Sequence, residues 1–181
     1  MSGLAAPLVN DLLYQTGWFV LVAGAASGRP RAASAIAAAL LALHRGMARD
    51  RQGELTLVML GGVMGTIIDS VLTASGLVQF ASGLIASWLC PPWVTIMWMR
   101  FATLFRGALG WLQGRPALGA LLGAMGGPTA YAAGEALGSI DLRGVETLIV
   151  LGIVWAAVIP VLLSAAAGRG VPGAIYRFER A

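Results

Sequence analysis

The sequence contains no lysine, one cysteine and one histidine, and these shortages exclude several kinds of active site. All twelve basic residues are arginine, so a Schiff-base lysine and the lysine of a phosphate-binding loop are both ruled out. Cys90 and His44 stand alone, so one chain can form neither an intrachain disulfide nor a zinc site of the usual cysteine and histidine type. From these residue types we expect no metal and no cofactor.

Charge is also scarce. Charged residues make up 11% of the chain, against about 25% in ordinary soluble domains, whereas hydrophobic residues make up 58%. This composition predicts an all-α membrane protein. With about 20 residues per span, the 181 residues leave room for about six transmembrane helices in a single polytopic domain that covers residues 1–181. The net charge of +4 fits arginines that meet anionic lipid headgroups, so we expect no nucleic-acid binding.

The apolar runs place the predicted spans. The six expected spans cover about 8–26, 32–43, 55–73, 93–112, 116–138 and 145–167. The apolar segment at about 74–90 is broken by Gly76 and Gly83 and is too short to cross about 30 Å. We expect it to be a short re-entrant or interfacial element; a seventh span is the alternative. Pro128 and Pro160 are expected to kink or loosen the fifth and sixth spans.

The distribution of arginine predicts the orientation. In the six-span arrangement one face carries Arg45, Arg49, Arg51, Arg115, Arg169, Arg177 and Arg180, which are seven, and the other carries Arg29, Arg31 and Arg143, which are three. Cytoplasmic loops carry the excess of basic residues. We therefore expect a multi-pass protein of the bacterial inner (cytoplasmic) membrane with both termini in the cytoplasm. Residues 168–181 resemble an anchor on an anionic membrane surface.

Five ionisable residues fall inside the predicted spans: Asp11, Asp69, Arg100, Arg106 and Glu135. A charge at membrane depth costs at least about 2.5–3.5 kcal/mol, so it persists when it is paired, faces water or has a function. One interpretation is structural, with Asp69 or Glu135 pairing with Arg100 and Asp11 pairing with Arg106. The other is a polar pocket that binds a headgroup, a substrate or a proton. The sequence leaves both open.

The hypothetical pocket has neighbours at helical spacing. Thr66 lies one turn before Asp69, Tyr131 lies one turn before Glu135, and Gln15 lies one turn after Asp11. The full set of candidate binding residues is Asp69, Arg100, Glu135, Tyr131, Thr66, Asp11, Gln15 and Arg106. No catalytic residue is assigned. His44 is expected at headgroup level near a helix end, and the glycines at four-residue spacing are expected to pack helices closely.

Three segments carry a resemblance to a known family: Tyr14-Gln15-x-Gly17-Trp18-Phe19, Gly65-Thr66-Ile67-Ile68-Asp69-Ser70, and Gly123-Ala124-Met125-Gly126-Gly127-Pro128 with the following Tyr131 and Ala133-Gly134. With these the chain resembles a bacterial inner-membrane family known as domain of unknown function 2878. The resemblance implies a small multi-span fold without an established activity, and its gene neighbours hint at lipid chemistry. Arg106 departs from the family pattern, in which an imidazole is common, and so does Glu135, where a neutral or basic residue is common.

Three functions compete. The first is an accessory or lipid-interacting protein whose partners are membrane lipids, a membrane protein or a second copy of the chain. The second is a small proton-coupled or solute transporter, which needs a polar path between the outer and inner charges. The third is an intramembrane lipid-modifying enzyme. The sequence lacks Gly-x-Ser-x-Gly, His-Glu-x-x-His and phosphate-loop signatures, so the prediction leans away from an enzyme.

Overall fold

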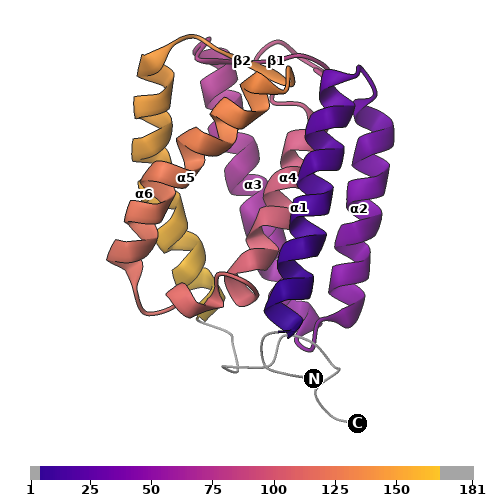
Figure 1. The fold of residues 1–181 in the computed structure, drawn as a ribbon, viewed down its shortest axis with the longest axis vertical. Helices are drawn as coiled ribbons and strands as arrows, with labels where there is room; N and C mark the ends of the chain where they lie inside the picture. The colour runs from indigo at the N-terminus through magenta and orange to yellow at the C-terminus, as the bar shows by residue number, and fades with distance from the viewer. Residues whose placement is uncertain (1–4, 168–181) are drawn as a thin grey trace.

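A computed structural model describes residues 5–167. It is mostly helical, which confirms the predicted fold class at that level (Figure 1). The helices of the described residues are α1 (Ala5–Ala26), α2 (Pro30–Met47), α3 (Arg51–Ala74), α4 (Pro92–Ala102), α5 (Pro116–Ala136) and α6 (Val145–Ala167). Two short 3-10 helices, η1 (Thr103–Arg106) and η2 (Gly110–Leu112), follow α4. The predicted surface anchor at 168–181 lies outside the described residues.

The helices run alternately up and down, so the start of α1 and the end of α6 lie at the same end of the molecule (Figure 1). We call this the inner end and the opposite one the outer end. In the view of Figure 1, α5 and α6 form one side, α1 and α2 form the other, and α3 and α4 lie between them. Pro30, Pro92 and Pro116 begin their helices, where the missing N–H costs no hydrogen bond.

Two of the helices, α3 and α6, are long and apolar enough to cross a membrane, judged over the described residues. The same test does not select the other four helices. Six spans therefore remain a prediction. Pro128 and Pro160 lie inside α5 and α6, and each helix continues through its proline. The predicted kinks remain predictions.

The segment at about 74–90, expected to be a re-entrant or interfacial element, contains a short strand. Gly76, with φ +71°, ends α3, and the backbone N–H of Leu77 donates to the Leu72 carbonyl at 3.0 Å, which is the bonding of a glycine-terminated helix. The strand β1 (Val78–Phe80) then pairs antiparallel with β2 (Ile140–Leu142), the connection between α5 and α6. The two strands cap the outer end (Figure 1).

The predicted helix at 93–112 is correct only in its first half. The helix α4 ends at Ala102, and η1 and η2 follow it. Side chains satisfy backbone groups of this segment: Asn10 Oδ1 accepts from the Ala108 N–H at 3.0 Å, and Gln113 Nε2 donates to the Phe105 carbonyl at 3.0 Å. Hydrophobicity alone therefore overestimated the length of this helix.

Cys90 lies in the connection between β1 and α4 and is buried. Its backbone N–H donates to the Ser70 hydroxyl at 3.1 Å, and burial raises the pKa of its thiol. A raised pKa keeps the thiol protonated near neutral pH, and the thiolate is the reactive form. We therefore expect a maleimide to label the native protein very slowly at pH 7.5 and to label it fully after denaturation. Labelling of the native protein as fast as the denatured chain would contradict this placement.

Candidate functional site

A cavity lies between α1 and α5 and reaches inward to α3, α4 and α6. It encloses about 550 Å³ including its open side. Eight aromatic side chains line it. Besides Phe80 and Trp93 there are six that we refer to as the aromatic wall: Tyr14, Trp18, Trp98, Phe101, Tyr131 and Trp155. Phe80 and Ile140 from the two strands close it toward the outer end. We call this space the aromatic cavity.

Asp69 is the one acidic side chain among the residues that line this cavity. It is fully buried on α3. The indole N–H of Trp98 donates to Asp69 Oδ2 at 2.5 Å, and the Tyr131 hydroxyl donates to Asp69 Oδ1 at 2.5 Å. The carboxylate thus joins α3 to α4 and α5 through two neutral donors. Each of its oxygens retains a lone pair for a further donor.

The rings around Asp69 pack on one another. Trp98 stacks on Trp155 with ring centroids 4.8 Å apart, and Phe101 meets Trp155 edge to face at 5.1 Å. Glycines make room for both indoles, because a Cβ at Gly65 would lie 1.9 Å from Trp98 and a Cβ at Gly127 would lie 2.2 Å from Trp155. The indole N–H of Trp155 is buried and has no hydrogen-bond partner among the described residues.

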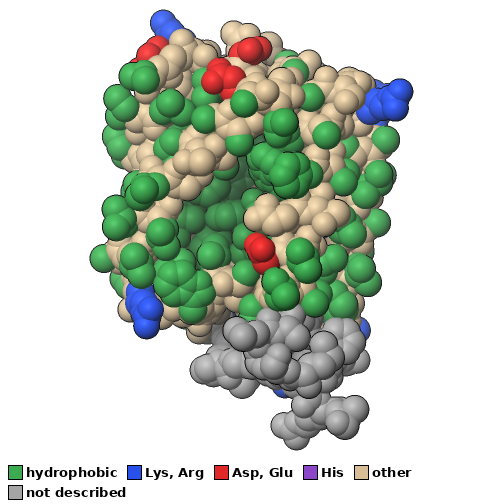
Figure 2. Space-filling model, in the orientation of Figure 1, with side chains coloured by type: hydrophobic (Ala, Val, Ile, Leu, Met, Phe, Trp, Pro, Cys, Tyr) green, Lys and Arg blue, Asp and Glu red, His purple; other side chains and the backbone are tan. Residues whose placement is uncertain are grey.

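The cavity continues into a wider groove between α1 and α5. Tyr14, Gln15 and Trp18 line it on the α1 side. The α5 side is lined by Leu122, Met125, Gly126, Thr129, Ala130 and Ala133. Figure 2 shows a hollow with hydrophobic walls at this position, in the face between α5 and α1. The aromatic cavity therefore opens through the side of the helix bundle.

Arg100 does not pair with Asp69. Its guanidinium extends from α4 toward α1 and α2, where it donates to the Ala37 carbonyl at 3.0 Å and to the Leu13 carbonyl. It passes over Gly17, where a Cβ would lie 2.1 Å from its Nε. The predicted pairing of Asp69 or Glu135 with Arg100 is therefore wrong. Arg100 instead holds together the side of the bundle that faces away from α5 and α6.

The other predicted site residues lie apart from the cavity. Glu135 is exposed and accepts from the Leu142 N–H at 2.9 Å, so it supports the two-stranded cap. Thr66 bonds to the Thr95 hydroxyl at 2.7 Å between α3 and α4. Asp11 is partly buried on α1 and does not pair with Arg106, so that predicted pair is also wrong. Of the eight candidates, the structure brings together Asp69 and Tyr131 and places Gln15 in the adjoining groove.

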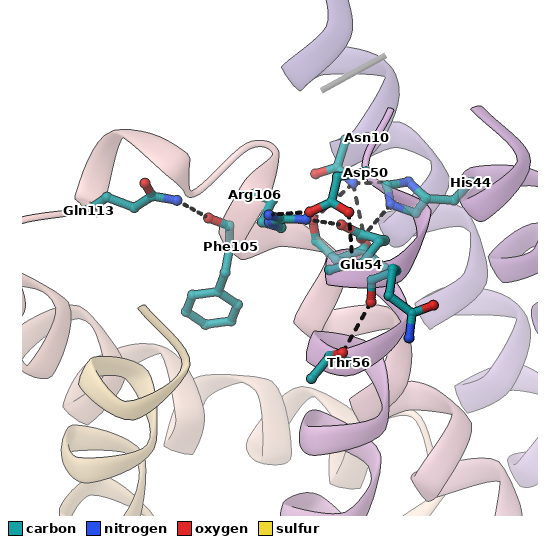
Figure 3. Close-up of polar contacts among 11 residues, drawn as sticks. Asn10, His44, Asp50, Glu54, Thr56, Phe105, Arg106 and Gln113 are labelled. Carbon is teal, nitrogen blue, oxygen red and sulfur yellow. Dashed lines mark hydrogen bonds and ion pairs between the residues drawn. The ribbon is translucent and has the colours of Figure 1, made fainter. Parts of the chain in front are cut away.

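A second polar group, which we call the inner cluster, lies at the inner end of the bundle (Figure 3). His44 and Glu54 are both buried, and His44 Nε2 lies 2.7 Å from Glu54 Oε1. Arg106 pairs with Asp50 at 2.9 Å and lies 3.9 Å from Glu54. Asp50 also caps α3 by accepting from the Gly53 N–H at 2.9 Å. The inner cluster thus ties α2, α3 and η1 together.

Asn10 sets the direction of the hydrogen bonds through His44. Its Oδ1 accepts from a backbone N–H, so its Nδ2 is the atom that faces His44 Nδ1 at 3.5 Å. An amide nitrogen only donates, so His44 Nδ1 accepts and the ring proton lies on Nε2, where it is donated to Glu54. Asn10, His44 and Glu54 form a directional chain of hydrogen bonds from α1 to α3.

Sequence reasoning placed His44 at headgroup level and assigned no role to Asn10 or Glu54. The available signal was spacing: His44 and Glu54 stand at the two ends of one short helix connection, and such a connection brings neighbouring helix ends together. Among the described residues there is no group of three or more histidine, cysteine, aspartate or glutamate side chains that could hold a metal ion.

The variant Glu54→Gln tests the energetic weight of the inner cluster. Glutamine keeps an acceptor for His44 but presents an NH₂ group and no charge to Arg106, so we expect a loss of about 1–2 kcal/mol of stability. Thermal unfolding of the purified protein measures it. Glu146→Gln is the matched control, since the Arg143–Glu146 contact is long and exposed, at 3.9 Å. Equal effects of the two changes would contradict a stabilising role for the cluster.

Comparison with known proteins identifies a family for this chain but no activity. The family model described as "Protein of unknown function (DUF2878)" matches residues 7–161. No curated protein and no solved structure matches the chain. The matched range contains the aromatic cavity, its groove and the inner cluster.

Proposed function

The chain belongs to the DUF2878 family of proteins of unknown function, and from that premise we propose that it is an integral membrane protein whose aromatic cavity binds a membrane lipid. The observation that carries the proposal is a cavity with aromatic walls and one buried carboxylate that opens sideways between two helices, α1 and α5. A side opening of this kind faces acyl chains when the bundle stands in a bilayer.

The outer surface of the bundle supports a membrane environment. Large apolar side chains are exposed at helical spacing on α3 (Met59, Val63, Ile67, Val71), α5 (Leu118, Leu121, Met125) and α6 (Val145, Ile149, Ile153). The apolar windows of α3 and α6 are only 39% and 33% buried inside the molecule, whereas a core helix of a water-soluble protein is mostly buried. Apolar patches of this extent are rare on soluble monomers.

The distribution of charge supports an orientation in which the helices cross the bilayer. Charged side chains in Figure 2 lie mainly toward the two ends of the molecule, with a broad hydrophobic band between them. The α4 helix is 11 residues, about 16 Å, so it would cross only together with η1 and η2. In this arrangement Arg45, Arg49, Arg51, Arg106 and Arg115 lie toward the inner end, and Arg29, Arg31 and Arg143 lie toward the outer end. Five against three favours a cytoplasmic inner end.

A proton-coupled transporter is supported less well. Such a function needs a polar path between Asp69 and the inner cluster. Phe101 and the fully buried Phe105 pack edge to face at 5.2 Å on the segment that connects the two. Apolar rings at this position favour a binding site over a polar path for protons or solutes. An intramembrane lipid-modifying enzyme has weaker support. Tyr131 donates to Asp69, but the described residues that line the cavity include no histidine, lysine or second carboxyl group to act as a further acid or base.

Filling the cavity tests the proposal. Ala130 lines both the cavity and the groove, so Ala130→Phe places a ring inside it. We expect wild-type protein, extracted in mild detergent, to carry lipid detectable by native mass spectrometry, and Ala130→Phe to carry at least about fivefold less. Leu121→Phe is the matched control, because Leu121 is exposed on α5 and lines neither space. Equal lipid in wild type and Ala130→Phe would overturn lipid binding in the cavity.

A further inference from the structure

The buried carboxylate of the aromatic cavity has no cationic partner. Within residues 5–167 both contacts of Asp69 are neutral donors, from Trp98 and Tyr131. The indole can only donate, and the tyrosine hydroxyl donates here, so both oxygens of Asp69 act as acceptors, as in a carboxylate. Arg100, the buried arginine of α4, points to carbonyl oxygens of α1 and α2. Among residues 5–167, the Asp69 carboxyl group therefore has no cationic partner, so an ionised Asp69 has no counter-charge there.

The walls of the cavity are rich in aromatic side chains. The faces of aromatic rings carry negative electrostatic potential, and tryptophan provides the strongest attraction for a cation. Trp18, Trp98 and Trp155 all line the cavity together with Asp69. Aromatic side chains together with a carboxylate are the residue types that recognise an ammonium group. A buried unpaired charge is costly, so a guest that supplies the opposite charge gains affinity.

A second observation points to an absent guest. The indole N–H of Trp155 is buried and lines the cavity; it lies near the Tyr131 hydroxyl but makes no well-aligned hydrogen bond among the described residues. A buried donor without a partner costs about 1–3 kcal/mol, and native structures rarely leave one unpaired. A phosphate or ester oxygen of a lipid would supply that acceptor. The cavity thus presents a carboxylate for a cation and an indole donor for a nearby oxygen.

Asp69 lies near the outer end of α3, at a depth that a lipid headgroup can reach. It lies five residues before the last residue of α3, about 7–8 Å from the outer end of that helix. Building on the proposed function, we propose that the aromatic cavity selects phospholipids with a cationic ammonium headgroup over anionic ones. The ammonium group lies against Asp69 and the aromatic wall. The acyl chains extend out of the cavity through the groove between α1 and α5.

Quenching of tryptophan fluorescence by brominated lipids tests this selectivity. Protein in mixed micelles is titrated with phosphatidylethanolamine or phosphatidylglycerol, each with brominated acyl chains. Ala130→Phe gives the quenching caused by lipids outside the cavity, which is subtracted. We expect phosphatidylethanolamine to bind wild type about tenfold more tightly, equivalent to about 1.4 kcal/mol. Asp69→Asn keeps an acceptor oxygen for the Trp98 indole and turns an NH₂ group toward the Tyr131 hydroxyl, which can accept, but it carries no charge. It should reduce the preference to less than about twofold.

A lipid variant keeps the test decisive if Asp69→Asn fails to fold. Phosphatidylethanolamine whose amine is acetylated has the same chains and phosphate without the cation, so unchanged wild-type protein should bind it about as weakly as phosphatidylglycerol. Equal affinity for all three lipids would overturn the headgroup selectivity and leave lipid binding intact. Quenching of wild type no greater than that of Ala130→Phe would overturn the proposed function itself.

Discussion

Gly123→Ala is expected to lower the stability of the protein by about 2–3 kcal/mol, although it adds a single methyl group. Gly123 is buried on α5, and a Cβ there would lie 2.4 Å from the backbone carbonyl oxygen of Trp155 on α6. A side chain can change its rotamer to avoid an added methyl group, whereas a helix backbone cannot. The methyl group would therefore push α5 and α6 apart and displace Trp155 from the aromatic cavity. Thermal unfolding and the near-ultraviolet circular dichroism of the tryptophans measure both effects.

Gly126→Ala is the matched control on the same helix. Nothing lies within 4 Å of a Cβ at Gly126, and alanine is favoured over glycine in helices by about 0.5–1 kcal/mol. We expect this variant to be at least as stable as wild type. If both variants behaved alike, the close approach of α5 to α6 would be refuted.

Arg100→Glu is expected to prevent the protein from folding, and adding Asp69→Arg is not expected to restore it. The first change turns a carboxylate toward the carbonyl oxygens of Ala37 and Leu13, which repel it. The second change puts a guanidinium against the indole N–H of Trp98, so donor meets donor. If Asp69 and Arg100 formed an ion pair, exchanging the charges at the two positions would preserve that pair. Yield of monodisperse protein after size-exclusion chromatography reports the outcome.

Less disruptive substitutions test whether Asp69 and Arg100 contribute to stability independently of each other. In a double-mutant cycle of Asp69→Asn and Arg100→Met, residues that do not interact should have effects that add within about 0.5 kcal/mol. Methionine fills much of the volume of arginine, and the two carbonyl oxygens keep their bonds within α1 and α2. Recovery of folded protein by the full exchange, or a coupling well above that limit, would show that Asp69 and Arg100 pair after all.

Helices could be predicted from this sequence because long apolar runs leave few other ways to satisfy the backbone. The bounds of the sixth predicted helix, 145–167, agree with α6, and those of the first, third and fifth differ by a few residues. The end of α4 could not be predicted, since residues 103–112 are apolar and their backbone is satisfied by side chains from distant positions such as Asn10. Pairing of β1 with β2 likewise joins segments about sixty residues apart, which no local pattern reveals.

The candidate site was predicted in part for a similar reason. The rise of a helix gives the height of a side chain, so the sequence places Asp69, Arg100 and Glu135 at comparable depth. Height does not tell which neighbouring helix a side chain faces. Asp69 faces α5 and meets Tyr131, whereas Arg100 faces α1 and α2. The inner cluster was missed because His44 is a lone histidine beside charged loop residues, and its burial depends on the packing of α1 against η1.

The sideways opening of the aromatic cavity bears on how fast its guest is exchanged. Phe80 and Ile140 close the outer end, and the groove faces the zone that we assign to acyl chains. If the cavity binds a lipid as we propose, that lipid never has to leave the hydrocarbon phase to be replaced. Turnover would follow two-dimensional diffusion and the mole fraction of that lipid among its neighbours, and it would be insensitive to the lipid's very low aqueous solubility.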